Sequence, residues 1–332
     1  MEEFATNIMM TLPTAALLLI MAATFYTLSK GADILVEEAV SLSLHWGVSK
    51  MIIGATIVSL GTTLPETTVS VLAAINGNPD LALGNAIGSI IVDTGLIIGA
   101  ASLVGHLPVD RATIERQGKI QILSGIMLAI VCLPFLSSGK TGNISQFTGF
   151  LFLILLVLYI FMSIKWAKKS NTIVNGLMEE RSPLLLQLLK LAAGLFLVIV
   201  SSKILIPSVE ITAVRVGIPQ SIIAATIVAF GTSLPELVTA ITAVRKGHGE
   251  LAVGNIVGAD ILNVLFVTGA SAAVTKGGLN VPPNFYNLQI PAMVIILIAF
   301  RCFAKSGDNR ISKTEGLVLL GIYMVYLVLN YI

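Results

Sequence analysis

A ten-residue stretch occurs twice in this chain, 170 residues apart, and each copy carries a glutamate in strongly apolar surroundings. The copies read GTTLPETTVS at 61–70 and GTSLPELVTA at 231–240. Each glutamate, Glu66 or Glu236, directly follows a proline. Because a carboxylate is costly inside a lipid bilayer, one that recurs at the same place in a repeat indicates a functional site. A duplicated, broken, acid-bearing helix is typical of a secondary transporter's substrate site.

Composition places nearly the whole chain in a membrane. It is 55% hydrophobic and only 11% charged, whereas soluble domains carry about 25% charged residues. Its apolar runs of about 20 residues suit helical spans, because barrel strands are shorter and alternate in polarity. Cys132 and Cys302 both lie in apolar segments, which predicts buried free thiols. With a net charge of +2, nothing in the sequence indicates a nucleic-acid or protein partner.

The apolar segments predict an all-α integral membrane protein with ten transmembrane helices. A polar stretch at 168–182 separates a first five-helix repeat, residues 1–167, from a second, residues 183–332. The expected spans are 11–41, 50–75, 80–104, 118–137, 145–167, 183–214, 219–244, 250–274, 285–304 and 313–331.

The distribution of Lys and Arg predicts the orientation in the cell membrane. Loops on one side of the ten spans, including the 168–182 linker, hold most of these residues, whereas the other side holds Lys140, Arg215 and Lys276. By the positive-inside rule, the linker is cytoplasmic and both termini are extracellular. Since each half has an odd number of spans, the second half enters the membrane inverted relative to the first.

The internal repeat extends well beyond the ten-residue motif. Residues 54–100 align without gaps to 224–270, with nineteen identical pairs among forty-seven. Gly84 and Asn85 match Gly254 and Asn255. Apolar helices share Leu and Val by chance, but matches of Gly, Pro, Asn and Glu in register indicate a true repeat.

Hydroxyl residues accompany each glutamate at helical spacing. Thr62 and Glu66 are one turn apart on the same face. Pro65 lacks an amide hydrogen and so frees a carbonyl one turn back, which a bound cation could satisfy. The first copy contributes Ser59, Thr62, Thr63 and Glu66, and the second contributes Ala229, Thr232, Ser233 and Glu236.

The next helix in each half supplies a second polar position. Ser89 and Asp93 are four residues apart, as are Ala259 and Asn263. Small-xxx-small glycine spacings beside them allow close helix packing. In an inverted repeat, Glu66 and Glu236 meet near the midplane with Asp93 and Asn263 beside them, which predicts broken helices around one midplane ion site.

The predicted ligands are all oxygen atoms, since no His, Cys or Met lies at this level. Such a set suits hard cations such as Ca²⁺ or Na⁺ rather than zinc or copper. Two glutamates neutralise one Ca²⁺, and emptying the site leaves like charges that recruit other cations or protons. This is a physical basis for competition between Ca²⁺ and Na⁺ or H⁺, without any cofactor.

The paired motifs GTTLPE and GTSLPE, followed by GNAIGSIIVD and GNIVGADILN, resemble the α-repeats of the cation/Ca²⁺ exchanger superfamily. The similarity is greatest to its prokaryotic Na⁺/Ca²⁺ exchangers. The resemblance implies ten helices, alternating access and typically three Na⁺ exchanged for one Ca²⁺. It also assigns ligands. Those for Ca²⁺ are Glu66, Glu236 and the carbonyls of Thr62 and Thr232; those for Na⁺ are hydroxyls of Thr63, Ser233 and Ser89 with carbonyls of Ser59 and Ala229, while Asp93 and Asn263 take the central polar positions.

The chain departs from the family pattern at three positions. Asn followed by Asp is common at the central pair, but here Asp93 comes first and Asn263 second. Ala259 replaces a serine whose hydroxyl would be a Na⁺ ligand, and Asp260 stands where Asn is common. These changes bear on Na⁺ stoichiometry more than on the Ca²⁺ site. Asp260 is a candidate ligand or access-path charge, or else it pairs with a neighbouring helix.

Several alternatives remain beside an Na⁺/Ca²⁺ antiporter. A Ca²⁺/H⁺ antiporter of the same fold is favoured slightly by Ala259, and a K⁺-cotransporting variant is also compatible. The chain is not expected to be an enzyme, because it contains no HExxH motif and no nucleophile–base pair. A channel is disfavoured by broken helices at one midplane site, which favour alternating access.

Overall fold

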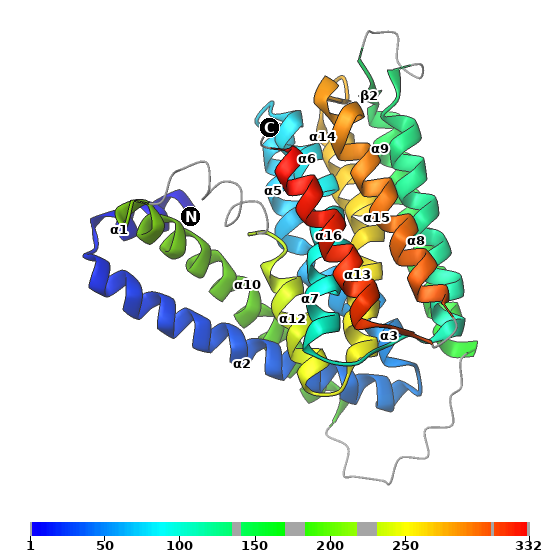
Figure 1. The fold of residues 1–332 in the computed structure, drawn as a ribbon, viewed down its shortest axis with the longest axis horizontal. Coiled ribbons are helices and arrows are strands. Elements are labelled where there is room, and N and C mark those ends of the chain that lie inside the picture. Colours follow the sequence, from blue (N-terminus) through cyan, green and yellow to red (C-terminus); the bar gives the residue numbers. More distant parts are fainter. Residues whose placement is uncertain (1, 135–140, 170–182, 218–230, 307–308, 331–332) are drawn as a thin grey trace.

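The fold was analysed in a computed structural model that describes residues 2–134, 141–169, 183–217, 231–306 and 309–330. The described chain is almost entirely helical, with only four two-residue strands. Figure 1 shows two long helices leaning away at one side from a bundle made by the others. This confirms the prediction of an all-α protein.

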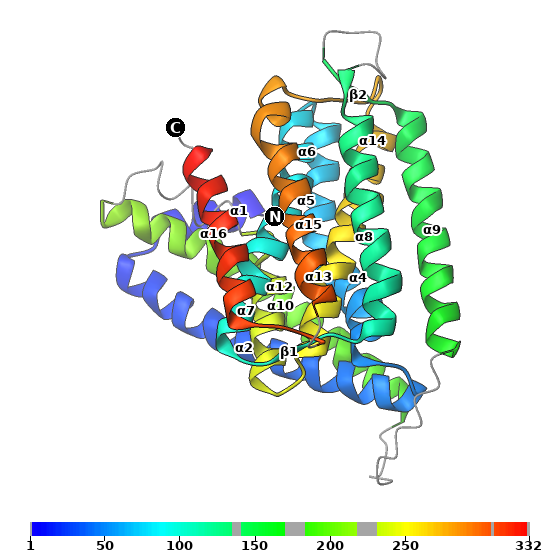
Figure 2. The same cartoon turned by 45° about the vertical axis from the view of Figure 1, so that its right-hand side comes forward.

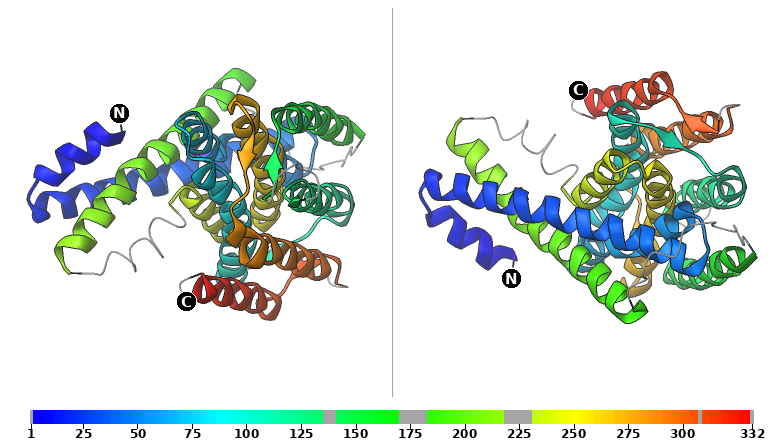
Figure 3. Two further views of the ribbon diagram at one scale, coloured as in Figure 1. Left: turned by 90° about the horizontal axis from the view of Figure 1, so that it is seen from above. Right: turned by 90° about the horizontal axis from the view of Figure 1, so that it is seen from below.

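The two long helices are α2, Thr14–Trp46, and α10, Leu184–Arg215, and they pack on each other. A Cβ at Gly31 would lie 3.0 Å from the Gly194 carbonyl oxygen, and the reverse distance is also 3.0 Å. The helices therefore cross where neither has a side chain, which lets their backbones touch. The short helix α1, Glu2–Thr11, which the sequence did not predict, lies against α10. Figure 3 shows this group projecting from the bundle.

The bundle contains the two repeat motifs and the helices around them. In the first half its elements are α3 Lys50–Ile53, η1 Gly54–Val58, α4 Ser59–Thr62, α5 Leu64–Ile75, α6 Pro79–Ile91, η2 Val92–Ile97, α7 Ile98–Val104, β1 Leu107–Pro108, α8 Arg111–Val131, β2 Asn143–Ile144 and α9 Gln146–Lys169. In the second half they are α12 Leu234–Arg245, α13 Gly249–Leu262, η5 Asn263–Thr268, α14 Gly269–Val274, β3 Leu279–Asn280, η6 Phe285–Gln289, α15 Ile290–Lys305, β4 Arg310–Ile311 and α16 Lys313–Leu329.

Two small antiparallel strand pairs join the halves. β1 pairs with β4, and β2 pairs with β3. Figure 2 places β1 and β2 at opposite ends of the molecule. In each pair, one strand follows the third predicted span of its half, as β1 and β3 do. The other strand precedes the last helix of the other half, as β4 and β2 do.

The helix contacts follow the same exchange of partners. α7 packs on α16, and α14 packs on α9. Likewise α8 contacts α13, and α15 contacts α6. These contacts therefore come in pairs in which the roles of the two halves are reversed.

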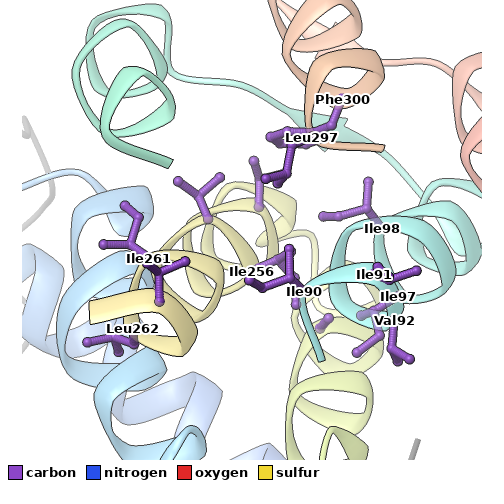
Figure 4. Close-up of a cluster of buried hydrophobic side chains, with 14 of the residues drawn as sticks. Ile90, Ile91, Val92, Ile97, Ile98, Ile256, Ile261, Leu262, Leu297 and Phe300 are labelled. Atoms are coloured by element: carbon purple, nitrogen blue, oxygen red, sulfur yellow. The ribbon is translucent and has the colours of Figure 1, made fainter. Parts of the chain in front are cut away.

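The core lies where α13 meets the α6–α7 segment and α15. Figure 4 shows Ile256 of α13 beside Ile90 of α6, with Leu297 and Phe300 of α15 covering them. All four side chains are buried. α13 is buried along nearly its whole length, as expected for a helix surrounded by others rather than by lipid.

Helical elements occupy the described parts of all ten predicted ranges. By length and hydropathy, six described helices can each cross a membrane, and the bent pair Lys50–Thr62 and Leu64–Ile75 makes a possible seventh. This supports a multi-pass membrane protein. α16, with 17 residues, and α8, with four charged residues in its first three turns, fall outside that set.

The cysteines are free thiols, as predicted, but only one is buried. Cys132 is buried and Cys302 is exposed. The prediction that both would be buried was therefore wrong for Cys302. An apolar segment in a membrane protein can turn a face outward to lipid, so hydropathy alone does not distinguish packed positions from lipid-facing ones.

Candidate ion-binding site

In each repeat motif a helix begins just before the glutamate, and in the first copy it follows a break in the preceding helix. Between α4 and α5 the axis bends by 42°, and Thr63 at the junction has φ −79° and ψ −2°. Ser233, at the same place in the second copy, has φ −85° and ψ 9°. Pro65 and Pro235 begin the following helices, where a missing amide hydrogen leaves no intrahelical bond unmade. The proline thus starts a new helix instead of continuing the old one.

Both glutamates lie in the first turn of a helix. Glu66 lies in α5 and Glu236 in α12. The side chains are 1% and 0% exposed, and the two carboxyls interact electrostatically with each other. A helix N-terminus carries partial positive charge, which favours a carboxylate. The two acids that the repeated motif carries therefore lie within electrostatic reach of each other.

The second helix of each repeat widens where its polar residue lies. Asp93 lies in the π-helical segment η2, and Asn263 begins the π-helical segment η5. Both side chains are buried. π-Bulges are rare and concentrate at functional sites, because they displace the hydrogen-bond ladder and redirect a side chain. Asp93 interacts electrostatically with Glu66 and Glu236.

Two asparagines tie the halves together next to the glutamates. Asn85 Oδ1 accepts a hydrogen bond from Thr232 Oγ1 at 3.0 Å, and Asn255 Oδ1 accepts one from Thr62 Oγ1 at 3.4 Å. Asn85 Nδ2 also donates to the Glu66 backbone carbonyl at 3.2 Å and to Ser70 Oγ at 2.9 Å. The asparagines stood out in the sequence only as matching positions of the repeat, yet each joins one half to the other.

The predicted ligands carry buried oxygens that have no hydrogen-bond partner among the described residues. Buried polar atoms are normally paired, so a converging group of unpaired oxygens indicates an unseen partner such as a cation. The Ser233 hydroxyl approaches the Glu66 and Asp93 carboxyls without full hydrogen-bond geometry. The unpaired set comprises Thr63 Oγ1, both oxygens of Glu66, both of Asp93, Ser233 Oγ, both of Glu236 and Asn263 Oδ1.

The remaining predicted residues lie around this group. Ser59, Thr62 and Ser89 are buried, and Thr232 is half-buried. The Ser59 carbonyl accepts the Thr63 amide at 2.9 Å and the Thr62 hydroxyl at 3.4 Å, so an ion bound there would replace the longer hydroxyl bond. Ala229 lies outside the described residues.

Carboxylates alone do not form a metal cage here. Among the described residues, no three Asp, Glu, His or Cys side chains are grouped closely enough to hold a metal by themselves. A cation would therefore need hydroxyl, amide and carbonyl oxygens as well. Such a mixed set suits Na⁺ or a readily released Ca²⁺, whose ligands are flexible in number.

Asp260 is buried beside this group but faces another helix. Its Oδ2 accepts hydrogen bonds from Thr94 Oγ1 at 2.5 Å and from Gln121 Nε2 at 2.6 Å. These contacts agree with the alternative that Asp260 pairs with a neighbouring helix. Gln121 lies on α8, which sequence reasoning did not connect with the site, since one glutamine in an amphipathic segment gives no signal of its own.

Acids near the ends of the long helices form ion pairs instead. Lys246 binds Asp33 at 3.2 Å and Glu37 at 2.6 Å, and Lys190 binds Glu38 at 3.4 Å. The contact with Glu37 raises the pKa of Lys246; burial opposes this rise, and the contact with Asp33 adds to it. These carboxyls are thus engaged at the α2 surface rather than at the central site.

A cavity of about 550 Å³ lies between the η1 region and α9, away from the glutamates. Its lining is mostly apolar, with Tyr159 at its inner wall. The Tyr159 hydroxyl donates to the Ala55 carbonyl at 2.8 Å, inside the π-helical segment η1. This bond satisfies a backbone group that the widened helix leaves unpaired.

Comparison with known proteins found similar sequences that extend over nearly the whole chain. A family model described as sodium/calcium exchanger protein matches residues 16–165 and 186–332. The inner membrane protein YrbG of Escherichia coli (strain K12) is 32% identical over 97% of this chain and 98% of its own length. The sodium/calcium exchanger MaX1 of Methanosarcina acetivorans is 27% identical over 94% of this chain and 97% of its own.

A solved structure shows the same architecture. The sodium-calcium exchanger NCX_Mj, soaked with Na⁺ and Ca²⁺, superposes with a TM-score of 0.79 at 25% identity. The match covers 95% of this chain and 97% of that one. The similarity therefore spans both halves of the molecule.

Proposed function

The chain belongs to the sodium/calcium exchanger family, and we propose that it exchanges Na⁺, three ions in each cycle, for one Ca²⁺ by alternating access. Exchangers are antiporters rather than enzymes, which agrees with the absence of a catalytic motif from the sequence. The transported ions are substrates and need no resident cofactor. The site residues and the coupling ratio are part of this proposal.

The observation that carries the proposal is the group of buried, unpaired oxygens around Glu66 and Glu236. Two carboxylates balance the charge of one Ca²⁺, and hydroxyl and carbonyl oxygens can complete its shell. We assign Ca²⁺ to Glu66, Glu236 and the carbonyls of Thr62 and Thr232. Na⁺ is assigned to the hydroxyls of Thr63, Ser233 and Ser89 and the carbonyls of Ser59 and Ala229, with Asp93 and Asn263 at the centre.

The reciprocal contacts of the two halves support an inverted repeat of two five-helix units, residues 1–167 and 183–332, joined by the 168–182 linker. The strand pairs and the paired asparagine contacts each recur with the halves exchanged. A two-fold axis in the membrane plane gives a site that both sides can reach in turn. The excess of Lys and Arg in alternate loops supports a cytoplasmic linker and extracellular termini.

The test is Ca²⁺ uptake by purified protein in liposomes with an outward Na⁺ gradient. Wild-type protein should accumulate Ca²⁺, whereas Glu66→Gln and Glu236→Gln should each abolish uptake, because an amide lacks the charge and one acceptor oxygen. Glu250→Gln, an acid-to-amide change in the first turn of α13, is the control and should transport normally.

A matched experiment with an imposed pH gradient separates Na⁺ from H⁺ coupling. The proposal predicts little uptake when only a proton gradient is present. Uptake driven by the pH gradient and indifferent to Na⁺ would instead establish the Ca²⁺/H⁺ antiporter. Normal flux in both glutamate variants would refute the assigned site.

A further inference from the structure

The central region holds more acid than one Ca²⁺ can balance. The buried side chains of the described residues include four acids, Glu66, Asp93, Glu236 and Asp260, and no lysine or arginine. The two glutamates match the charge of one Ca²⁺. Asp93 and Asp260 are then left, and a buried carboxyl needs either a cation beside it or a proton.

Asp260 is only half satisfied by its hydrogen bonds. Thr94 and Gln121 both donate to Oδ2, whereas Oδ1 has no hydrogen-bond partner among the described residues. The side chain is 1% exposed, so bulk water does not reach Oδ1. Its unpaired oxygen is therefore free to coordinate an ion.

Gln121 adds a second unpaired oxygen at the same place. Its Nε2 donates to Asp260, so the amide group is held against the carboxyl, while its Oε1 has no described partner. Gln121 is 1% exposed. A buried amide oxygen held next to a buried carboxylate is a normal ligand pair for a hard cation.

Asp93 completes the group from η2. It directly precedes Thr94, the residue that donates to Asp260, and both of its carboxyl oxygens are unpaired. Asp93 interacts electrostatically with Asp260 as well as with Glu236. It therefore lies within electrostatic reach of both the central glutamates and Asp260.

We propose that Asp260, Asp93 and Gln121 form a lateral site, on the α8 side of the central glutamates, that binds one Na⁺. The inference rests on the proposed exchange function and adds a Na⁺ position to it. Three side-chain oxygen donors suit a monovalent ion better than Ca²⁺, which takes 6–8 oxygen ligands.

The test measures equilibrium binding of radioactive sodium to the purified protein, so that it does not depend on transport. Asp260→Asn should bind about one Na⁺ fewer than wild type, while its half-saturating Ca²⁺ concentration changes less than about twofold. Gln121→Leu, which loses the amide oxygen, should keep the count but weaken the lateral Na⁺ by about fivefold, the usual effect of one lost ligand. Glu250→Gln on the same helix is the matched control and should bind like wild type.

The outcomes separate this inference from the proposed function. If wild type drives Ca²⁺ uptake with Na⁺ but Asp260→Asn binds as many Na⁺ ions, the lateral site is refuted and the exchanger stands. An unchanged Na⁺ count together with an altered pH dependence of Asp260→Asn would show that Asp260 carries a proton, which also refutes it. If wild type neither binds Na⁺ nor couples it to Ca²⁺, the exchange function itself fails. Na⁺-induced thermal stabilisation, expected to be smaller in Asp260→Asn, confirms that the variant is folded.

Discussion

At the scale of single residues, the chain places acids and hydroxyls where a bilayer normally excludes them, and it leaves their oxygens unpaired. Glu66, Glu236 and Asp93 were all identified from the sequence, because a charge in an apolar repeat has few structural explanations. Asn85 and Asn255 were not, since an asparagine can serve packing, capping or ligation equally well. Only the contacts with Thr232 and Thr62 show that they link the halves.

The Ala259→Ser variant tests whether a hydroxyl at position 259 strengthens Na⁺ binding. Ala259 is fully buried, and its methyl group cannot coordinate an ion, whereas Ser89 occupies the equivalent place in the first repeat. Ala259→Ser should lower the half-saturating Na⁺ concentration of Ca²⁺ uptake by about fivefold, with little change for Ca²⁺, because one added ligand contributes about 1 kcal/mol. Ser89→Ala is the companion variant and should shift the Na⁺ dependence the opposite way. If the half-saturating Na⁺ concentration does not decrease in Ala259→Ser, position 259 is not a missing Na⁺ ligand.

At the scale of elements, small residues and helix breaks decide how closely the repeat helices approach. The sequence predicted tight packing at Gly254 and Gly258, and the structure shows what they touch. A Cβ at Gly258 would lie 2.4 Å from Ser59 Oγ and 2.6 Å from the Ala55 carbonyl oxygen. The π-helical segments η2 and η5 could not be predicted, because they change the hydrogen-bond ladder without changing the hydropathy pattern.

Adding a methyl group at Gly258 should therefore separate α13 from the helix that carries Ser59. Gly258→Ala is expected to destabilise the protein by about 1–3 kcal/mol, because the clash is partly with backbone and cannot be relieved by rotating a side chain. Gly321→Ala is the control, since no described atom lies within 4 Å of the added carbon. Thermal unfolding in detergent measures the stability of both variants. Equal stability of the two variants would contradict the close packing of α13.

His248, at the start of α13, makes a contact between the two halves that the sequence did not reveal. It is half-buried, and its Nδ1 lies 3.2 Å from Lys50 Nζ at the start of α3. Burial lowers its pKa below the usual 6.5, and the charges of Lys50 and Lys246 lower it further. The neutral ring can therefore accept a hydrogen bond from Lys50, joining the two halves at one end of the molecule.

The lowered pKa makes this contact sensitive to acid. The unfolded chain binds a proton near pH 6.5 while the folded chain resists it, so stability is fully present above pH 6.5 and falls as the pH drops toward the folded pKa. Thermal unfolding followed from about pH 7.5 to about pH 5 should thus show a steeper loss for wild type than for His248→Gln. Parallel curves for the two proteins would show that His248 does not contribute.

At the scale of the whole molecule, the internal repeat of the sequence is matched by contacts that recur with the two halves exchanged. The ungapped match of residues 54–100 to 224–270 required two like units, and the exchanged strand pairs and helix contacts follow that pattern. The crossing of α2 and α10 at Gly31 and Gly194 was hidden, because long-range contacts between apolar helices leave no periodic signal. The contact of Asp260 on α13 with Gln121 on α8 was hidden for the same reason.

Coupling of three Na⁺ to one Ca²⁺ makes the whole cycle electrogenic, with one net positive charge moving along with the Na⁺. In liposomes loaded with Na⁺, a potential that is positive inside should therefore increase Ca²⁺ accumulation, and a negative one should decrease it. One charge crossing 100 mV is worth about 2.3 kcal/mol, so the equilibrium Ca²⁺ ratio should change by about fiftyfold. Clamping the potential with valinomycin and known K⁺ gradients measures this, with Glu66→Gln liposomes as the background. A Ca²⁺ ratio that ignores the potential would indicate a neutral exchange of two Na⁺ for one Ca²⁺, and then one Na⁺ fewer would take part in the cycle than the family resemblance implies.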